Sequence, residues 1–267
     1  MELPIDAIPS ENKPRDKRLD NLNYENLPKL PATFCVLGRC GSGKSSILYS
    51  LLTKGYTYGK SHKSVFDEAI IYLGTQDSIG AFQKLPIKNK IILDEFDPQD
   101  FQEYLDDLKT HQMERLDKNK PPLNTVMVFD DFVGQGLTKV HNHKSSPLER
   151  LALTSRHECN SSIFFCAQVF RNSGFSTPTV RNNITTYIIS QMTSNEMRKV
   201  AEEHCQDLTP DEFIEIYETI MKKRPYNFMV IDMRRPLDAR ITERFHIPIQ
   251  KPKRFAASLE ADKNVEI

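Results

Sequence analysis

The sequence carries no net charge and contains no long apolar run. Its 267 residues include 36 lysines and arginines and 36 aspartates and glutamates, so the overall balance argues neither for nor against a nucleic-acid partner. No stretch approaches the roughly 18 apolar residues of a membrane span, and no charged-then-apolar signal peptide opens the chain. The mean hydropathy is −0.50. We therefore expect neither a membrane span nor secretion.

Cysteine is scarce and its spacing is irregular. The five cysteines are odd in number, and no two of them have C-x-x-C spacing, which favours reduced thiols in a cytosol-like compartment. The pairs His141-x-His143 and His204-Cys205 have no second cluster nearby that would complete a metal site. We interpret them as loop and surface residues.

The length fits one large domain with tails, because a domain typically has about 150 residues. Residues 1–30 are charged, contain Pro4, Pro9 and Pro14, and have few apolar residues in register, so we expect an extended N-terminal arm. Residues 31–247 are predicted to form the domain, and residues 248–267 a C-terminal tail. No internal repeat is visible.

Within residues 31–247, short apolar runs alternate with longer amphipathic stretches. This pattern is typical of an α/β domain with a mostly parallel sheet flanked by helices. Helices are predicted at residues 45–53 and 100–116, from residue 146 onward, and twice within residues 194–221. Strands are predicted at residues 33–37, 69–73, 91–93, 125–129, 162–167, 186–189 and 227–231.

One motif carries specific chemistry: residues 38–45 match the phosphate-loop pattern G-x-x-x-x-G-K-[ST] in full. Glycines let successive backbone N–H groups converge on phosphate oxygens, and the helix that follows directs its positive end at the same anion. Lys44 is expected to reach the β- and γ-phosphates of ATP, and the Ser45 hydroxyl to bind Mg²⁺. The predicted nucleotide-binding residues are Gly38, Arg39, Cys40, Gly41, Ser42, Gly43, Lys44, Ser45 and Ser46.

Such a site needs a second strand, beside the first, that ends in aspartate. Two strands qualify, one followed by Asp94-Glu95 and the other by Asp130-Asp131. Asp94-Glu95 continues directly into an acidic helix, so its carboxylates fit that helix's first turn. We therefore favour Asp130 and Asp131.

On this assignment, Asp130 orders the water shell of Mg²⁺. Asp131 accepts the proton of the attacking water or orients that water. Gln168, which follows the apolar strand at residues 162–167, is predicted to sense the γ-phosphate or hold the water. Its alternative role is that of a polar residue capping a loop.

The order of these motifs resembles that of the genome-packaging ATPases of large eukaryotic DNA viruses and virophages, a branch of the FtsK–HerA superfamily. Most superfamily members place glutamate at the position of Asp131, whereas several viral members have aspartate. The resemblance covers residues 32–245, and the residues that carry it are Gly38–Ser45, Val128–Asp131, Ser155-Arg156-His157, Gln168, Thr179–Asn183 and Tyr226–Asp232.

This resemblance implies a RecA-like core, ATP hydrolysis, a homo-oligomeric ring of five or six subunits, and translocation of double-stranded DNA into a capsid. A capsid or vertex protein is an implied partner. The implied location is the host cytoplasm or a viral factory, with association with the virion as a further option. Two alternatives stay open: another P-loop enzyme, such as a nucleotide kinase or a helicase-like repair ATPase, and a nucleotide-gated scaffold with negligible turnover.

A ring ATPase usually completes each site with an arginine from the neighbouring subunit. Arg156 and Arg181 are the main candidates for this catalytic role, and Arg171 is a third. No helix-turn-helix or zinc-finger motif marks a DNA-binding element. The loop after Asp131 supplies a hypothetical DNA contact through Lys139, His141, His143 and Lys144.

Although the net charge is zero, the acidic and basic residues are concentrated in different segments of the chain. Residues 93–117 hold nine acidic and two basic residues, whereas residues 221–254 hold ten basic and three acidic ones. Solvation of both segments explains this pattern as well as function does. The functional hypothesis is that the basic C-terminal segment meets DNA or the acidic face of a neighbouring subunit.

Overall fold

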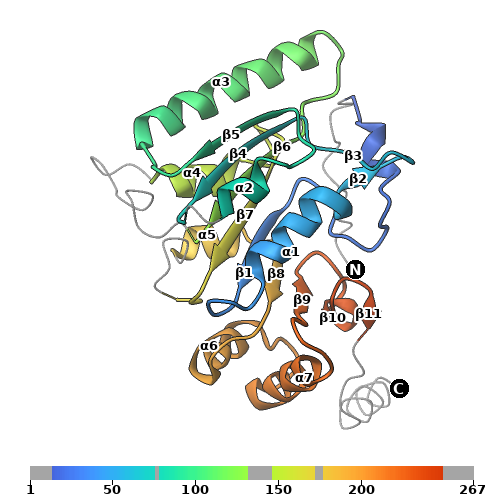
Figure 1. Ribbon diagram of the computed structural model, residues 1–267, viewed down its shortest axis with the longest axis vertical. Helices are drawn as coiled ribbons and strands as arrows, with labels where there is room; N and C mark the ends of the chain where they lie inside the picture. The colour runs from blue at the N-terminus through green and yellow to red at the C-terminus, as the bar shows by residue number, and fades with distance from the viewer. Residues whose placement is uncertain (1–13, 76–77, 132–145, 172–176, 249–267) are drawn as a thin grey trace, which may run out of the picture.

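The computed structural model describes residues 14–75, 78–131, 146–171 and 177–248. These residues build one nine-stranded sheet in the order β11-β10-β9-β8-β1-β7-β6-β4-β5, and a separate hairpin of β2 and β3 (Figure 1). The strands are β1 (Thr33–Leu37), β2 (Thr57–Tyr58), β3 (Lys63–Ser64), β4 (Glu68–Leu73), β5 (Asn89–Leu93), β6 (Thr125–Asp130), β7 (Ser161–Ala167), β8 (Thr186–Ile189), β9 (Met229–Asp232), β10 (Ile241–Glu243) and β11 (Ile247–Pro248).

The strands from β5 to β8 are all parallel, whereas β9, β10 and β11 each run antiparallel to the preceding strand. The predicted mostly parallel α/β sheet is confirmed. The predicted adjacency of the Asp130 strand and the first strand is wrong, because β7 lies between β1 and β6 and pairs with both. The carboxyl end of β7 therefore lies between the phosphate loop and the Asp130–Asp131 corner.

Helices cover both faces of the sheet. One face carries α1 (Lys44–Ser50), the π-helical turn η2 (Leu51–Gly55) and α2 (Ile79–Phe82). The other face carries α3 (Pro98–Asp117), α4 (Pro147–Thr154), α5 (Pro178–Asn182), α6 (Ser194–His204) and α7 (Pro210–Lys222). Short 3-10 turns lie at Lys17–Asp20 and Leu237–Ala239. No helix among the described residues is long and apolar enough to cross a membrane.

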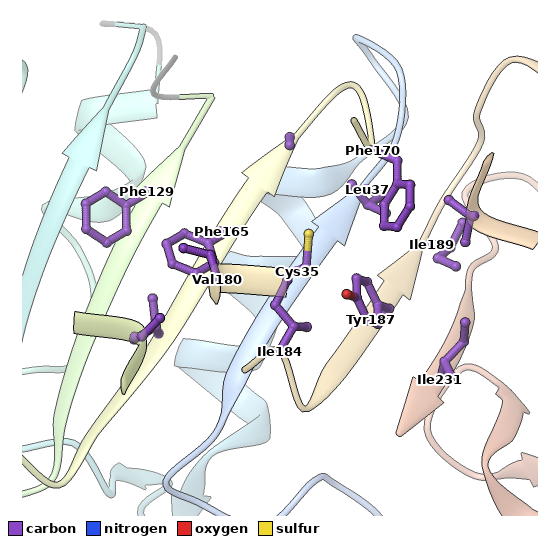
Figure 2. Close-up of a cluster of buried hydrophobic side chains, with 14 of the residues drawn as sticks. Cys35, Leu37, Phe129, Phe165, Phe170, Val180, Ile184, Tyr187, Ile189 and Ile231 are labelled. Carbon is purple, nitrogen blue, oxygen red and sulfur yellow. The ribbon is translucent and has the colours of Figure 1, made fainter. Parts of the chain in front are cut away.

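Alternation along each strand divides the core into two halves. In β1, Phe34 and Val36 face the half under α1, whereas Cys35 and Leu37 face the half under α3 to α7. Figure 2 shows the second half, where side chains of β6, β7, β1, β8 and β9 line one face of the sheet. Because both faces are covered, the central strands are buried along their whole length and mostly apolar, which is why they can be predicted from the sequence.

Side-chain caps start the helices where the sequence places Ser, Thr or Asp before proline. Ser146 and Glu149 form a reciprocal capping box at α4, and Thr209 and Glu212 form another at α7. Asp97 caps α3 by accepting hydrogen bonds from the backbone N–H groups of residues 99 and 100. The prediction that the Asp94-Glu95 carboxylates lie in the first turn of this helix is wrong, because α3 begins at Pro98 and Asp97 caps it.

Two residues that the helical spacing of apolar positions predicts to be buried, Met113 of α3 and Leu153 of α4, are exposed instead. The buried stripe of α3 consists of Phe101, Leu105, Leu108 and Gln112, and the side chain of Met113 is 58% exposed. Gln112 is buried because its amide donates to the carbonyls of Leu123 and Cys159 and accepts from the N–H of Leu123. One position along a helix is a rotation of about 100°, which carries residue 113 off the stripe. Leu153 of α4 is likewise exposed.

The described part of the predicted N-terminal arm packs against the domain. The Arg18 guanidinium contacts both carboxylate oxygens of Asp67 at 2.8 Å, and Leu27 is buried among core residues. The Tyr56 hydroxyl donates to the carbonyl of Pro28 at 2.8 Å. Residues 1–13 and 249–267 lie outside the described residues, and the division into arm, domain and tail stays a prediction.

Candidate nucleotide site

The phosphate loop connects β1 to α1 and is fixed to the strands on both sides. The Gly38 N–H donates to the carbonyl of Ala167 in β7, and the Arg39 N–H donates to the carbonyl of Gln191 beyond β8, at 3.2 and 2.8 Å. Gly41 and Gly43 have φ values of +72° and +89°, a backbone region that glycine adopts without strain. The loop thus turns tightly within a rigid frame.

Gly38 leaves no room for a side chain. A Cβ atom there would lie 1.9 Å from Ser190 Oγ and 2.4 Å from Ser42 Oγ. These two hydroxyls lie 2.8 Å apart, and Ser190 Oγ also donates to the carbonyl of Leu37 at 2.9 Å. Ser190 therefore holds the loop from the neighbouring strand end. Sequence analysis missed Ser190 because its contact depends on the pairing of β1 with β8.

Lys44 is buried beneath the loop, with 4% of its surface exposed. Its ammonium lies 3.5 Å from Asp131 Oδ1 and 3.4 Å from the carbonyl of Arg39. The geometry brings together the lysine and one of the carboxylates that the sequence singled out. The cation and the anion meet at the edge where the parallel strands end, which we call the carboxyl edge.

Asp130 ends β6 at the same edge and is buried. Burial raises the pKa of its carboxyl group and the charge of Asp131 adds to this rise, whereas hydrogen bonds with Ser45 and Cys166 and the charge of Lys44 oppose it. Its Oδ1 atom has no hydrogen-bond partner among the described residues. Mg²⁺ prefers oxygen ligands. The Ser45 hydroxyl and the buried Asp130 carboxylate, one oxygen of which has no partner among the described residues, are ligands of this kind.

Asp131 leaves the strand in a left-handed backbone conformation, with φ of +47°. Aspartate and asparagine enter this region more readily than most residues, because their short polar side chains bond locally. The turn aims the carboxylate back toward Lys44. Residues 132–145 lie outside the described residues, and with them the predicted DNA contacts Lys139, His141, His143 and Lys144.

The competing pair Asp94-Glu95 follows β5 at the edge of the sheet. Strands β4, β6 and β7 separate β5 from β1, and both side chains are exposed. Three intervening strands place this pair far from Lys44, so the geometry favours Asp130 and Asp131. Gln168 is exposed directly after β7, at the carboxyl edge between β1 and β6.

The three candidate arginines lie away from their own phosphate loop. Arg156 precedes β7 and so lies at the opposite edge of the sheet, roughly 20 Å away by the length of a seven-residue strand. Arg181 lies in α5, where its Nε is 3.2 Å from Glu203 Oε1, rather than in the polar turn expected from sequence. Arg171 lies 3.7 Å from the same glutamate. Within the described chain, none of them lines a cavity at the loop.

A cavity of about 1150 Å³ opens beside the phosphate loop and runs along α1. It is bordered by Lys44, Thr75, Asp131, Tyr226 and Arg244, among others. Tyr226 is 72% exposed and its ring would touch a Cβ atom on Gly43 at 3.4 Å. An exposed aromatic ring beside the loop is suited to stacking on a nucleobase. Sequence analysis assigned Tyr226 no role in binding.

A second cavity, of about 570 Å³, lies on the other side of the loop. Its basic lining residues are Arg39, Lys222, Lys223 and Arg224. Glu243 holds two of them, with Lys223 at 2.6 Å and Arg224 at 3.0 Å. Although burial acts to raise the pKa of Glu243, the hydrogen bonds from Lys223, Asn227 and Arg224 bring it down to about 2.

The histidine and cysteine residues form no metal centre in the part of the chain described here. His204 is nevertheless buried rather than on the surface, because its ring packs against Tyr187 at 4.3 Å and Phe170 at 5.6 Å. All five cysteines are free thiols, and Cys40 in the phosphate loop is exposed.

No family model matches the chain, and no curated protein matches it in sequence. Solved structures share its fold. B204, the DNA-packaging ATPase from Sulfolobus turreted icosahedral virus, has a TM-score of 0.53 at 15% identity, covering 82% of this chain and 98% of that one. The ATPase 2 and 3 segment of EssC from Geobacillus thermodenitrificans has a TM-score of 0.52 at 15% identity, covering 88% of this chain and 43% of that one. This chain thus has the RecA-like P-loop NTPase fold.

Proposed function

We propose that this chain is an ATP-hydrolysing ring motor that moves double-stranded DNA into a viral capsid. The observation that carries the proposal is the convergence of Lys44, Ser45, Asp130 and Asp131 around one phosphate loop. These groups come from two separate parts of the sequence and meet at the carboxyl edge of the sheet. The fold shared with B204, which is described as a DNA-packaging ATPase, supports the motor reading.

Each residue then has a defined task in ATP hydrolysis. The backbone N–H groups of the loop and the Lys44 ammonium hold the phosphates and offset the charge that develops on them. Ser45 and Asp130 would hold Mg²⁺, which supplies further positive charge at the β- and γ-phosphates. The ring of Tyr226 is placed to stack on the base at the mouth of the larger cavity.

Water activation falls to the residues beside Lys44. Asp131 accepts a proton from the attacking water, or orients it, because its carboxylate already points toward the phosphate-binding lysine. Gln168 holds the water from the end of β7, which lies between the two strands that carry the other groups. Both roles are parts of the proposal.

An arginine from a neighbouring subunit completes the site. Arg181 is occupied by Glu203 within its own chain, whereas Arg156 lies half-buried at the opposite edge of the sheet from its own loop. We keep Arg181 as the second candidate for this role and Arg156 as the first. Its removal should lower hydrolysis without lowering nucleotide affinity.

The test is the rate of ATP hydrolysis with and without double-stranded DNA, on protein whose mass is measured by light scattering. A motor assembles and hydrolyses faster when DNA is present. Protein that stays monomeric and ignores DNA overturns the proposal. A kinase would hydrolyse slowly until given a phosphate acceptor, and a scaffold would turn over negligibly under every condition.

Lys44→Ala provides the decisive variant. We expect at least a hundredfold loss of DNA-stimulated hydrolysis, because the lysine stabilises charge on the transferred phosphoryl group. Lys54→Ala is the matched control, since Lys54 borders the same cavity from the far end of η2. Hydrolysis by Lys54→Ala should stay near that of the native chain, and an equal loss in both variants would contradict the assignment.

A further inference from the structure

Seven carboxylates gather at one end of the sheet. Residues 94–107 contain no lysine, arginine or histidine, and all of their acidic side chains are exposed. They follow the end of β5 and continue along the first half of α3, so they begin at the carboxyl edge. The acidic surface is defined as Asp94, Glu95, Asp97, Asp100, Glu103, Asp106 and Asp107.

A basic surface lies at the other end of the same edge. It consists of Arg39, Lys222, Lys223 and Arg224, which line the smaller cavity together with phosphate-loop residues. The carboxylates that contact these cations are Glu218, 3.4 Å from Lys222, and Glu243, which Lys223 and Arg224 share. Four cations against two carboxylates leave the surface positive.

The two surfaces cannot meet within one chain. Four to six strand spacings, from β5 to β1 and to β9, separate them, or about 19–29 Å at roughly 4.8 Å per spacing. Figure 1 shows α3 and β5 at one end of the long axis and α7 with β9 at the other. Salt screens charges over about 10 Å, so the two surfaces of one copy hardly interact, and each can attract an external partner of opposite charge.

We infer that the acidic surface of one copy docks on the basic surface of the next, an inference that rests on the ring assembly of the proposed function. Non-identical surfaces at opposite ends of one molecule form a head-to-tail contact, and such contacts close into rings when the rotation between copies permits.

A second copy of the chain offers an oppositely charged partner to both surfaces, whereas DNA offers one only to the basic surface. Nucleic acid would bind the four cations but would be repelled by the seven carboxylates. Ile91 in the edge strand β5 is 51% exposed next to the acidic surface, which adds apolar area to a protein contact. The docked carboxylates would also lie beside Arg39, so assembly would depend on the state of the nucleotide site.

Charge reversal on each surface tests the pairing. The acidic surface is reversed by Glu103→Lys with Asp107→Lys, which lie one turn apart on α3 and spare the helix cap at Asp97. The basic surface is reversed by Lys222→Glu with Lys223→Glu, which leaves Arg224 and Asn227 bonded to Glu243. Lys60→Glu with Lys63→Glu, on the exposed β2–β3 hairpin, is the control.

Light scattering with ATP present measures the mass of each protein. Each reversed variant alone should need at least about tenfold more protein to assemble than the native chain, because like charges then face each other. An equimolar mixture of the two should assemble again, since contacts between unlike variants join opposite charges: all contacts in an alternating ring of six subunits, and four of the five in a ring of five. Mixing also shows that both variants are folded. The control should assemble as the native chain does.

Two results overturn the inference. One is assembly of either reversed variant at native concentrations. The other is a mixture that assembles no better than either variant alone, while circular dichroism shows both variants folded. In either case, a native chain that still forms rings keeps the motor proposal intact, because only the docking surfaces are then wrong. A native chain that stays monomeric overturns both.

Discussion

At the scale of single residues, backbone conformation explains a departure from the family that the chain resembles. Asp131 stands where most members of that superfamily place glutamate. Its φ of +47° lies in the left-handed region, where aspartate is favoured over longer side chains. The shorter side chain still lies 3.5 Å from Lys44, because the turn after β6 directs it inward.

Asp131→Asn separates chemistry from folding. Asparagine tolerates the same backbone conformation and has nearly the same shape, so nucleotide binding and thermal stability should persist. Hydrolysis should fall about a hundredfold or more, because the amide cannot accept a proton. Steady-state ATPase assays and nucleotide titration measure the two effects. If Asp131→Asn hydrolyses ATP at the native rate, another group must activate the water.

At the scale of elements, the local sequence pattern predicts where the described strands and long helices lie. It does not predict which elements pack against them. The spacing of apolar residues predicts Met113 on the buried stripe of α3, yet Gln112 takes that place because three hydrogen bonds satisfy its amide. Strands β10 and β11 are too short to show a period in sequence. Residue periodicity records one element's exposure, and it carries no information about which neighbour covers that element.

At the end of α6, burial of His204 against residues of other elements changes the pKa of its side chain. Burial, helped by the charge of Arg181, lowers the pKa of His204 to about 4. The unfolded chain binds a proton near pH 6.5, so it gains protons before the folded chain does as the pH falls. The free energy of unfolding should therefore decrease from about pH 6.5 to pH 4, by at most about 1.4 kcal/mol per pH unit from this group.

His204→Phe should remove that contribution. Phenylalanine keeps the ring contacts with Tyr187 and Phe170 and does not titrate. Urea unfolding at several pH values measures the slope, and His157→Phe serves as the control because His157 is exposed. A pH slope in His204→Phe equal to the native one would show that other groups cause it.

At the scale of the whole molecule, contacts between distant segments hold the described N-terminal residues in place. Arg18 pairs with Asp67 before β4 and with Asp16, whose carboxylate accepts from Asn124 before β6 at 2.6 Å. The Arg18 guanidinium thus balances the charge of two carboxylates, and Asn124 donates a hydrogen bond to each of them. The sequence predicts an extended arm for this segment because Asp67 and Asn124 lie more than forty residues away.

Arg18→Ala should lower the free energy of unfolding by about 1–3 kcal/mol, because it leaves two partly buried carboxylates without their cation. Arg15→Ala is a close control, since Arg15 pairs with Asp20 on an exposed surface, where such pairs contribute little. Urea denaturation compares both variants with the native chain. Equal stability losses would mean that the Arg18 cluster does not anchor the segment.

The sequence by itself determined the phosphate-loop motif with Lys44 and Ser45 and the apolar strands, and it predicted Asp130 and Asp131 as the acidic pair of the site. These features depend on residues close together in the sequence, because glycine conformation, the alternation of side chains along a strand and helix capping all act locally. The tertiary structure alone decided that β7 separates β1 from β6, that Ser190 supports the loop, and that the acidic and basic segments lie at opposite ends of one edge. Strand pairing joins residues far apart in sequence, so no local pattern specifies it.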